Sequence, residues 1–295
     1  MTPARNLPRV SLLVTDLDNT LWDWFAAWHA SFSAMLQKLS ELSDVPEEHL
    51  EHEIQLVHRQ RGTTEYSYLL NELPSLVQKV TGSDPSEVYD EAIHMLNRER
   101  LRNTRLYTGV KETLHELQRR KIPIVAYTES VAYWSEWRIR NTGLDGLVTV
   151  MYSSPDHDFP TGVSAQQLRT QPPHAYGLRK TVHRHVPPGV LKPNAEVLRS
   201  ILSDFRASPE TAVYVGDSLM KDVAMAQELG VHDVHAQYGV SHNRDGYDLL
   251  RRVSHWTPEE IEREKELSTR PTVTPSHVLT DGFSQLLTMF DFTEV

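Results

Sequence analysis

Four aspartates, a threonine and a lysine of this 295-residue chain each lie at the end of a predicted strand or near the start of a predicted helix. They are Asp16, Asp18, Thr128, Lys192, Asp217 and Asp222. Crowded carboxylates repel each other unless a cation neutralises them. Oxygen ligands without histidine or cysteine favour a hard ion, and Mg²⁺ typically binds one or two carboxylates together with water and phosphate oxygens. A carboxylate held in this way can attack phosphorus and form an aspartyl-phosphate. Lys192 and Mg²⁺ would then spread the charge on the phosphoryl oxygens.

The elements that must position these residues are short apolar strands separated by helices. Strands are expected at 10–14, 122–127, 147–152, 211–215 and 231–237, with helices at 109–121, 130–141, 194–205 and 219–229. Such alternation predicts a doubly wound parallel sheet. Ligands of these sheets bind beyond the carboxyl ends of the strands. Asp16 and Asp18 follow the first predicted strand, Thr128 the second and Asp217 the fourth, so we expect them at one edge.

Residues 22–106 differ from the rest of the chain, because they show helical periodicity and no convincing strand. We therefore predict two domains: an α/β core formed by residues 1–21 and 107–295, and an all-helical cap domain inserted at 22–106. Residues from about 153 to 188 are rich in Pro, Gly, His and polar residues. They are expected to form an irregular insertion in the core.

Composition limits the possible partners and the compartment. The formal net charge of −10 disfavours nucleic acid and anionic membranes as general partners. Cysteine is absent, which excludes a thiol nucleophile and a disulfide framework. The apolar stretch at 10–14 is too short for a signal-peptide core or a membrane span. We therefore expect a cytoplasmic protein without nucleic-acid or membrane partners, and the sequence indicates no oligomeric state.

Taken in order, the polar segments resemble the four motifs of the haloacid dehalogenase (HAD) superfamily. The segments are Asp16-Leu-Asp18-Asn-Thr20, Thr128, Lys192-Pro193 and Gly216-Asp217-Ser-Leu-Met-Lys-Asp222. Each segment alone is commonplace, but the ordered set is specific, and the resemblance extends over about residues 10–239. It implies a Rossmann-like HAD core, and residues 22–106 resemble the helical cap that closes over the site of such proteins and selects the substrate.

The resemblance also implies a role for each catalytic residue. Asp16 would be the nucleophile, and Asp18 the general acid and base. Thr128 would hydrogen-bond the transferring phosphoryl group, and Lys192 would pair with both the nucleophile and the phosphate.

The implied metal is Mg²⁺, with four aspartates as its ligands. Asp16 and Asp217 would bind it through their carboxylates, and Asp18 through its backbone carbonyl. Asp222 would bind it directly or through water.

Asp18 distinguishes between branches of the superfamily, since the dehalogenases lack an aspartate two residues after the nucleophile. Hydrolysis of a phosphoester needs a proton for the leaving oxygen and then a base for the attacking water. We therefore predict a phosphatase that acts on a small phosphorylated metabolite, whose identity the sequence does not give. Two alternatives are a phosphotransferase or phosphomutase with the same phospho-aspartate, and a non-catalytic binding protein that kept the fold.

Several histidines are weaker candidates for a site. His232 and His235 have the spacing of metal ligands, but His232 and its neighbour Asp233 point to opposite faces of a predicted strand, so a structural role is expected. His183 and His185 lie in the predicted insertion and are expected in solvent.

Aromatic and basic residues of the cap are also candidates for the substrate pocket. Trp22, Trp24 and Trp28 are expected to pack the root of the cap, with a place in the pocket as the alternative. Arg59 and Arg61 are expected on a solvated face, with binding of a substrate anion as the alternative.

Overall fold

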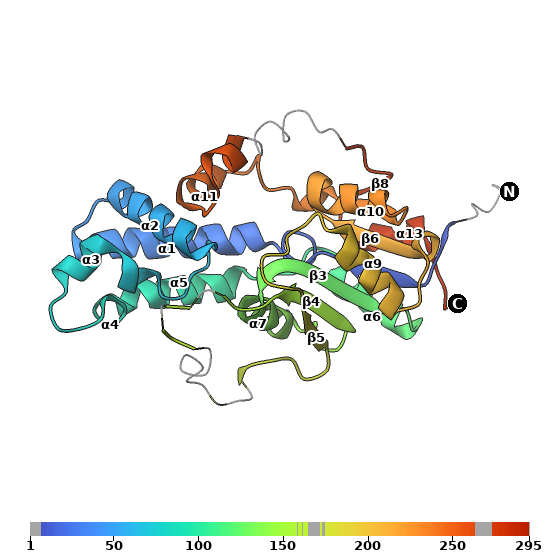
Figure 1. Ribbon diagram of the computed structural model, residues 1–295, viewed down its shortest axis with the longest axis horizontal. Coiled ribbons are helices and arrows are strands. Elements are labelled where there is room, and N and C mark those ends of the chain that lie inside the picture. The colour runs from blue at the N-terminus through green and yellow to red at the C-terminus, as the bar shows by residue number, and fades with distance from the viewer. Residues whose placement is uncertain are drawn as a thin grey trace.

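The core of the computed structural model is a seven-stranded sheet whose neighbouring strands are all parallel, in the order β5-β4-β3-β2-β6-β7-β8 (Figure 1). The structure describes residues 7–157, 159–160, 162–164, 172, 175–262 and 273–294. The strands are β2 (Leu12–Thr15), β3 (Ile124–Val131), β4 (Val150–Ser154), β5 (Val182–His185), β6 (Ala212–Gly216), β7 (His232–Ala236) and β8 (His277–Leu279). A separate parallel pair joins β1 (Arg9–Val10) to β9 (Asp291–Phe292).

Helices cover both faces of this sheet. Residues of α6 (Val110–Arg119), α7 (Ala132–Thr142) and α13 (Leu286–Met289) pack in one buried cluster with Leu13 of β2. Residues of α9 (Ala195–Asp204) and α10 (Ala224–Glu228) pack with Leu12 and Val14 on the other face. Successive side chains of a strand point to opposite faces, so β2 contributes to both clusters. The predicted doubly wound parallel sheet is confirmed.

The remaining helices form a second body beside the sheet (Figure 1). They are α1 (Trp24–Ser43), α2 (Glu47–Arg61), α3 (Pro74–Lys79), α4 (Pro85–Val88) and α5 (Asp90–Asn103), with a 3₁₀ turn at Leu69–Glu72. Asp23 caps α1 by accepting a hydrogen bond from the Ala26 N–H at 2.9 Å. Their apolar faces form a cluster separate from those of the sheet. This helical content agrees with a cap, whose bounds at 22–106 stay a prediction.

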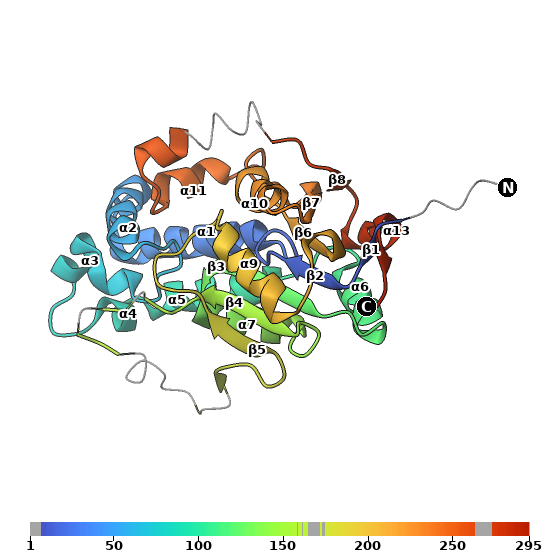
Figure 2. The same cartoon turned by 45° about the vertical axis from the view of Figure 1, so that its right-hand side comes forward.

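A late segment of the chain returns to the helical cap. Helix α11 (Tyr247–Val253) lies against α2 in both cartoon views (Figures 1 and 2). Tyr247, Leu250 and Val253 join the apolar cluster of the cap. The cap therefore draws part of its core from beyond the predicted inserted segment.

Several strand boundaries differ from the predicted ones. The predicted strand 122–127 continues as β3 to Val131, where it pairs with Ser154 after a shift in register. Within the segment of about 153–188, which the sequence predicts to be an irregular insertion, β5 forms an edge strand at 182–185. Its sequence, Val-His-Arg-His, lacks the apolar run that marks a buried strand, since an edge strand is covered less.

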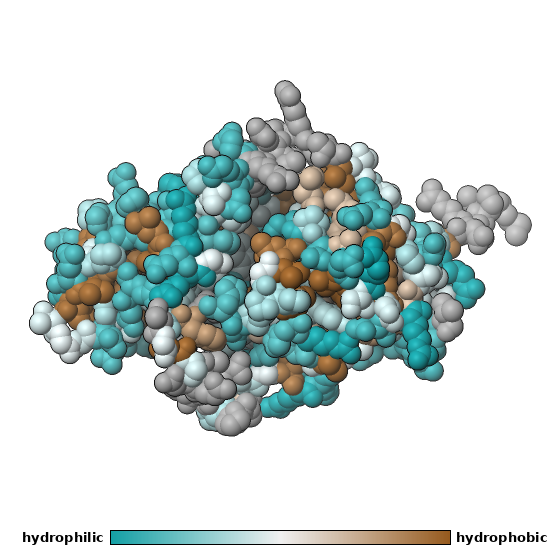
Figure 3. Space-filling view, viewed as in Figure 1, coloured by the Kyte–Doolittle hydropathy of each residue, from teal (hydrophilic) through white to brown (hydrophobic). Residues whose placement is uncertain are grey.

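The surface in Figure 3 is largely hydrophilic, with small apolar patches over both the helices and the sheet. Large apolar side chains that are exposed include Leu42, Leu56 and Val77 in the cap and Leu191 in the core. None of the described helices has the length and apolar character that crossing a bilayer requires.

The stability of the contact between α2 and α11 depends on pH through His58. Its ring is 1% exposed, and Nδ1 lies 2.6 Å from the Val253 carbonyl oxygen. Burial lowers the pKa of His58 to about 4. The unfolded chain would bind a proton near the usual pKa of about 6.5. The contribution of neutral His58 is therefore complete above pH 6.5 and is lost as the pH falls through 4.

We expect this effect to remove about 3 kcal/mol of unfolding free energy between pH 6.5 and 4. Asparagine at position 58 can still donate to the Val253 carbonyl and does not titrate, so His58→Asn should flatten this part of the pH profile. Urea unfolding of both proteins at several pH values measures the difference. Parallel pH profiles for the two proteins would contradict the assignment.

Candidate active site

Asp16 stands at the centre of the sheet, directly after β2, which lies between β3 and β6. Its backbone N–H donates to the Val215 carbonyl of β6 at 2.8 Å, so the peptide is fixed by the sheet. The residue is 7% exposed. Burial raises the pKa of Asp16 to about 7, Lys192 lowers it and Asp222 raises it. A carboxylate in this position is poorly solvated and depends on nearby positive charge.

Lys192 supplies part of that charge. Its Nζ donates to Asp16 Oδ1 at 2.5 Å and to Asp222 Oδ1 at 2.9 Å. Burial alone would lower the pKa of Lys192, but the charges of Asp16 and Asp222 outweigh burial and raise the pKa well above its usual value. The structure thus places a charged ammonium between two carboxylates.

Asp217 and Asp222 complete an acidic cluster with Asp16. One carboxylate oxygen from each lies within 4.8 Å of the others. Asp222 also accepts hydrogen bonds from the Tyr214 hydroxyl and the Ser218 N–H, both at 3.1 Å. Burial raises the pKa of Asp217 well above its usual range, and Asp16 and Asp222 raise it further. Three carboxylates beside one lysine hold more negative charge than the lysine neutralises, which suits a divalent cation.

Glycine at position 216 is required by the approach of Asp222 to the end of β6. A Cβ atom at Gly216 would lie 2.3 Å from the Asp222 Cγ, far inside van der Waals contact. The short helical segment Leu219–Val223 brings Asp222 back over this strand end. Glycine in the predicted Gly-Asp motif is therefore required by packing, and the role of Asp217 stays a prediction.

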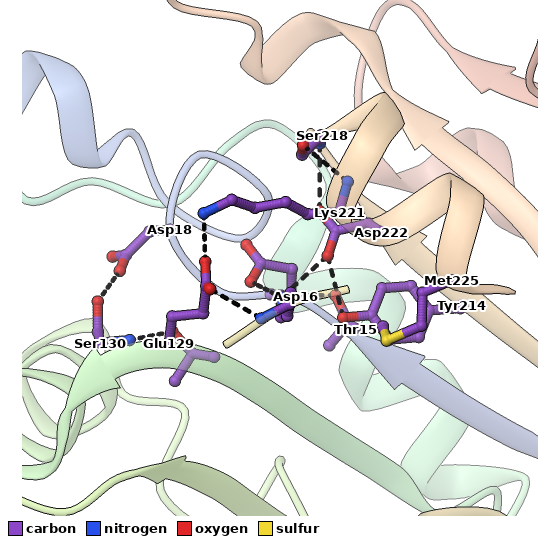
Figure 4. Close-up of polar contacts among 12 residues, drawn as sticks. Thr15, Asp16, Asp18, Glu129, Ser130, Tyr214, Ser218, Lys221, Asp222 and Met225 are labelled. Carbon is purple, nitrogen blue, oxygen red and sulfur yellow. Dashed lines mark hydrogen bonds and ion pairs between the residues drawn. The ribbon is translucent and has the colours of Figure 1, made fainter. Parts of the chain in front are cut away.

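Asp18 faces away from this cluster. Its Oδ1 accepts from Trp22 Nε1 at 2.6 Å, and its Oδ2 accepts from the Ser130 hydroxyl. Figure 4 shows its carboxylate turned toward Ser130, on the opposite side from Asp222. Arg138 Nη1 lies 3.6 Å from Asp18 Oδ1. These groups fix the carboxylate, and its predicted backbone contact with a metal stays a prediction.

Thr128 lies in β3, two residues beyond Ala126, which pairs with Thr15 of β2. It is buried, and its Oγ1 accepts from the Ser130 N–H at 3.1 Å. The structure thus puts Thr128 inside a strand rather than at the start of a helix. Its predicted contact with a phosphoryl group stays a prediction.

Comparison with models of protein families shows which family this chain belongs to. The model described as haloacid dehalogenase-like hydrolase matches residues 10–230, and a second HAD-hydrolase-like model matches residues 190–280. The chain belongs to the haloacid dehalogenase-like hydrolase family. The resemblance carried by the four motifs is therefore confirmed. A comparison with curated proteins gives no match.

This HAD-like hydrolase is similar to several solved structures at low sequence identity. The putative HAD-hydrolase YfnB from Bacillus subtilis, bound to magnesium, is 16% identical, with 96% of this chain and 99% of that chain covered and a TM-score of 0.51. A putative beta-phosphoglucomutase from Thermotoga maritima is 20% identical, with 88% and 100% covered and a TM-score of 0.49. The 2-haloacid dehalogenase from Pseudomonas syringae pv. Tomato DC3000 is 19% identical, with 95% and 97% covered and a TM-score of 0.48.

Glu129 is a site residue of this HAD-like hydrolase that the sequence did not single out. Its Oε1 accepts from the Lys192 backbone N–H at 2.8 Å, and its Oε2 accepts from Lys221 Nζ at 2.5 Å (Figure 4). It therefore holds the segment that carries Lys192. Adjacency to Thr128 was the sole signal for it in the sequence.

The sequence predicts that the tryptophans pack the root of the cap. The structure also gives each of them a specific contact. Trp22 holds Asp18, as described above, and Trp24 Nε1 donates to Glu65 Oε2 at 3.1 Å. Trp28 lines a cavity in the cap. Arg61 pairs with Glu72 at 2.5 Å, so its charge is compensated within the cap.

Three of the four histidines contact other polar groups of the core, and His232 Nε2 lies 3.0 Å from the Glu210 carbonyl oxygen. The expectation that His183 lies in solvent was wrong, because its side chain is 12% exposed and pairs with Glu136 at 2.8 Å. His235 Nε2 lies 3.0 Å from the Asp217 carbonyl oxygen, where it supports the loop of the acidic cluster. Among the residues that the structure describes, the candidate metal group contains neither His232 nor His235.

Proposed function

We propose that this HAD-like hydrolase is a Mg²⁺-dependent phosphatase that hydrolyses a small phosphorylated metabolite through an aspartyl-phosphate on Asp16. The observation that carries the proposal is the position of Asp16. Its carboxylate lies at the carboxyl end of the central strand, 2.5 Å from Lys192 Nζ and within reach of Asp217 and Asp222. Family membership supports hydrolysis. Asp18, two residues further on, supports a phosphoester as the substrate.

The donor set fits magnesium. All candidate side-chain ligands are carboxylate oxygens, which Mg²⁺ prefers. The three oxygens lie within 4.8 Å of one another, so Asp16, Asp217 and Asp222 together could hold one cation. Asp222 would bind it directly or through water, and Lys192, Tyr214 and Ser218 already bond its oxygens. The cation would neutralise the carboxylates and the phosphate.

The first chemical step would form the aspartyl-phosphate. An Asp16 carboxylate oxygen attacks phosphorus as the bond from phosphorus to the leaving oxygen breaks. Asp18, entering protonated, gives its proton to that oxygen, and the alcohol departs. Lys192 stays charged and stabilises the negative charge of the phosphoryl group. Hydrogen bonds from Trp22 and Ser130 keep the Asp18 carboxyl oriented through this transfer.

The second step would hydrolyse the intermediate. Asp18 is now a carboxylate and takes a proton from water, whose oxygen attacks phosphorus. The bond between phosphorus and the Asp16 oxygen breaks, which releases inorganic phosphate and restores both aspartates.

Metal removal tests the proposal. We expect the purified protein to release phosphate from a generic aryl phosphate with added Mg²⁺, to lose this activity with excess chelator, and to regain it when Mg²⁺ is restored. The released alcohol is measured together with phosphate, with and without added sugars. Equal amounts of both products indicate hydrolysis, whereas alcohol in excess of phosphate indicates transfer to the sugar. Activity that chelation leaves intact would contradict the proposal.

A further inference from the structure

A cavity of about 230 Å³ lies in the helical cap, where α1 and α5 face the first turn of α7. Much of its wall is apolar, with Trp28, Phe32 and Met35 from α1 and Leu96 from α5. A water molecule occupies about 30 Å³ in the liquid, so the cavity has room for roughly eight waters or a small organic group. It belongs to the part of the protein that is expected to select the substrate.

Arg100 places a positive charge on the wall of this cavity, where Glu65 acts on it without forming an ion pair. The residue is 8% exposed, and its guanidinium lies 4.0 Å from the Trp134 ring centroid. Across the described residues, the one hydrogen-bond partner of the guanidinium is Asn97 at a long 3.5 Å, and no carboxylate lies within 4.0 Å. Burial lowers the pKa of Arg100 to about 10, so it stays charged at neutral pH. A buried cation is costly unless an anion pairs with it.

The two neighbouring arginines on the same helix are paired, which makes Arg100 distinct. Arg98 and Arg102 both contact Glu99, at 3.1 Å and 3.3 Å, and their side chains are 58% and 67% exposed. Trp28 adds a second donor at this cavity, because its indole N–H is buried without an acceptor among the described residues. Arg100 and the Trp28 indole thus both lack a close acceptor among the described residues, which suits an acidic group from outside the chain.

The cavity is linked through Glu65 and Arg138 to Asp18, the residue that would protonate the leaving group. Glu65 lines it and forms a buried ion pair with Arg138, whose Nη1 lies 3.6 Å from Asp18 Oδ1. Tyr133 and Trp134 line the same cavity and follow Ser130, the partner of Asp18, by three and four residues. A leaving group whose oxygen contacts Asp18 would have to pass the ion pair of Arg138 and Glu65 to reach Arg100.

We propose that Arg100 binds a carboxylate on the leaving group, so that the substrate is the phosphomonoester of a small hydroxycarboxylic acid. This inference rests on the proposed phosphatase function. The planar fork of a guanidinium matches a carboxylate in two parallel hydrogen bonds. The leaving group could instead carry a second phosphate. Glu65 lines the same cavity, and its negative charge repels a phosphate dianion more strongly than a carboxylate, so a carboxylate is favoured. The apolar wall accommodates the carbon skeleton.

Matched substrates test the proposal. We would compare kcat/KM for 4-carboxyphenyl phosphate with that for 4-carbamoylphenyl phosphate, and for 3-phosphonooxypropanoate with that for its amide. Each pair differs by one charge at nearly constant size. We expect the wild-type protein to prefer the acid of at least one pair about 10- to 100-fold, as befits a charge-assisted hydrogen bond. Arg100→Met should reduce this preference to about onefold, while Arg98→Met should keep it.

Additional measurements test the proposal even if a variant misfolds or if hydrolysis is absent. Thermal unfolding reports folding, and Arg100→Lys, which keeps the charge without the fork, should retain an intermediate preference. Binding of 4-hydroxybenzoate and its amide to the Asp16→Asn protein measures carboxylate recognition without turnover. Carboxylate binding with no hydrolysis would reject the phosphatase and uphold Arg100. No wild-type preference for the acids, an unchanged preference in folded Arg100→Met, or a stronger preference for 1,4-phenylene bisphosphate would overturn the inference.

Discussion

Asp16→Asn is expected to reduce phosphate release by about 10,000-fold or more, because an amide cannot serve as the nucleophile toward phosphorus. The substitution nearly preserves the shape of the side chain, so the fold should persist. Initial rates on a generic aryl phosphate with saturating Mg²⁺ measure the loss, and thermal unfolding checks the fold.

The matched control is Asp44→Asn. Asp44 is an exposed aspartate at the end of α1, in a left-handed conformation with φ of 54° that asparagine tolerates well. We expect wild-type rates from this variant. Asp16→Asn protein that hydrolyses substrate as fast as the Asp44→Asn control would remove Asp16 from the mechanism.

Lys192→Met should affect both rate and stability. We expect a fall in kcat of about 100- to 1,000-fold, because one positive charge that stabilises the transition state is removed. In the metal-free protein the unfolding free energy should fall by about 3–5 kcal/mol at pH 8, since Asp16 and Asp222 lose the ammonium they share. Added Mg²⁺ should recover part of this stability, because the cation neutralises the same carboxylates.

Denaturant unfolding with and without Mg²⁺ measures the effect. Lys221→Met is the control, because Lys221 pairs with Glu129 from a side chain that is 51% exposed. Such a pair is worth about 1 kcal/mol or less. Two results would contradict the role of Lys192 in neutralising Asp16 and Asp222. One is an equal loss of unfolding free energy in the two lysine variants, and the other is no gain in stability when Mg²⁺ is added to Lys192→Met.

Apolar strands and the residues at their ends were predictable from the sequence. The run before Asp16 and the run before Gly216 form neighbouring central strands, β2 and β6, and their carboxyl ends meet at one edge of the sheet. That geometry brings Asp16 and Asp217 together without any knowledge of side-chain packing. Lys192 was located by its place in the ordered motif set.

Residues that act through packing were not predictable. Trp22, Ser130 and Arg138 contact Asp18 from three different elements, and no periodicity or spacing marks them. Nothing in the sequence distinguishes Arg100 from the charged residues around it, because its burial depends on how α1 and α7 lie against α5. The edge strand β5 was missed for a similar reason, since strands covered on one side lose the apolar signal.

Direct detection of a phosphorylated Asp16 tests the central claim most sharply. The protein is mixed with substrate and Mg²⁺, quenched in acid during turnover, digested, and examined by mass spectrometry. We predict one phosphoryl group on the peptide that contains Asp16, absent from Asp16→Asn protein and from samples without Mg²⁺. Rapid turnover with the phosphoryl group on another residue, or with none bound under any quench time, would contradict the account.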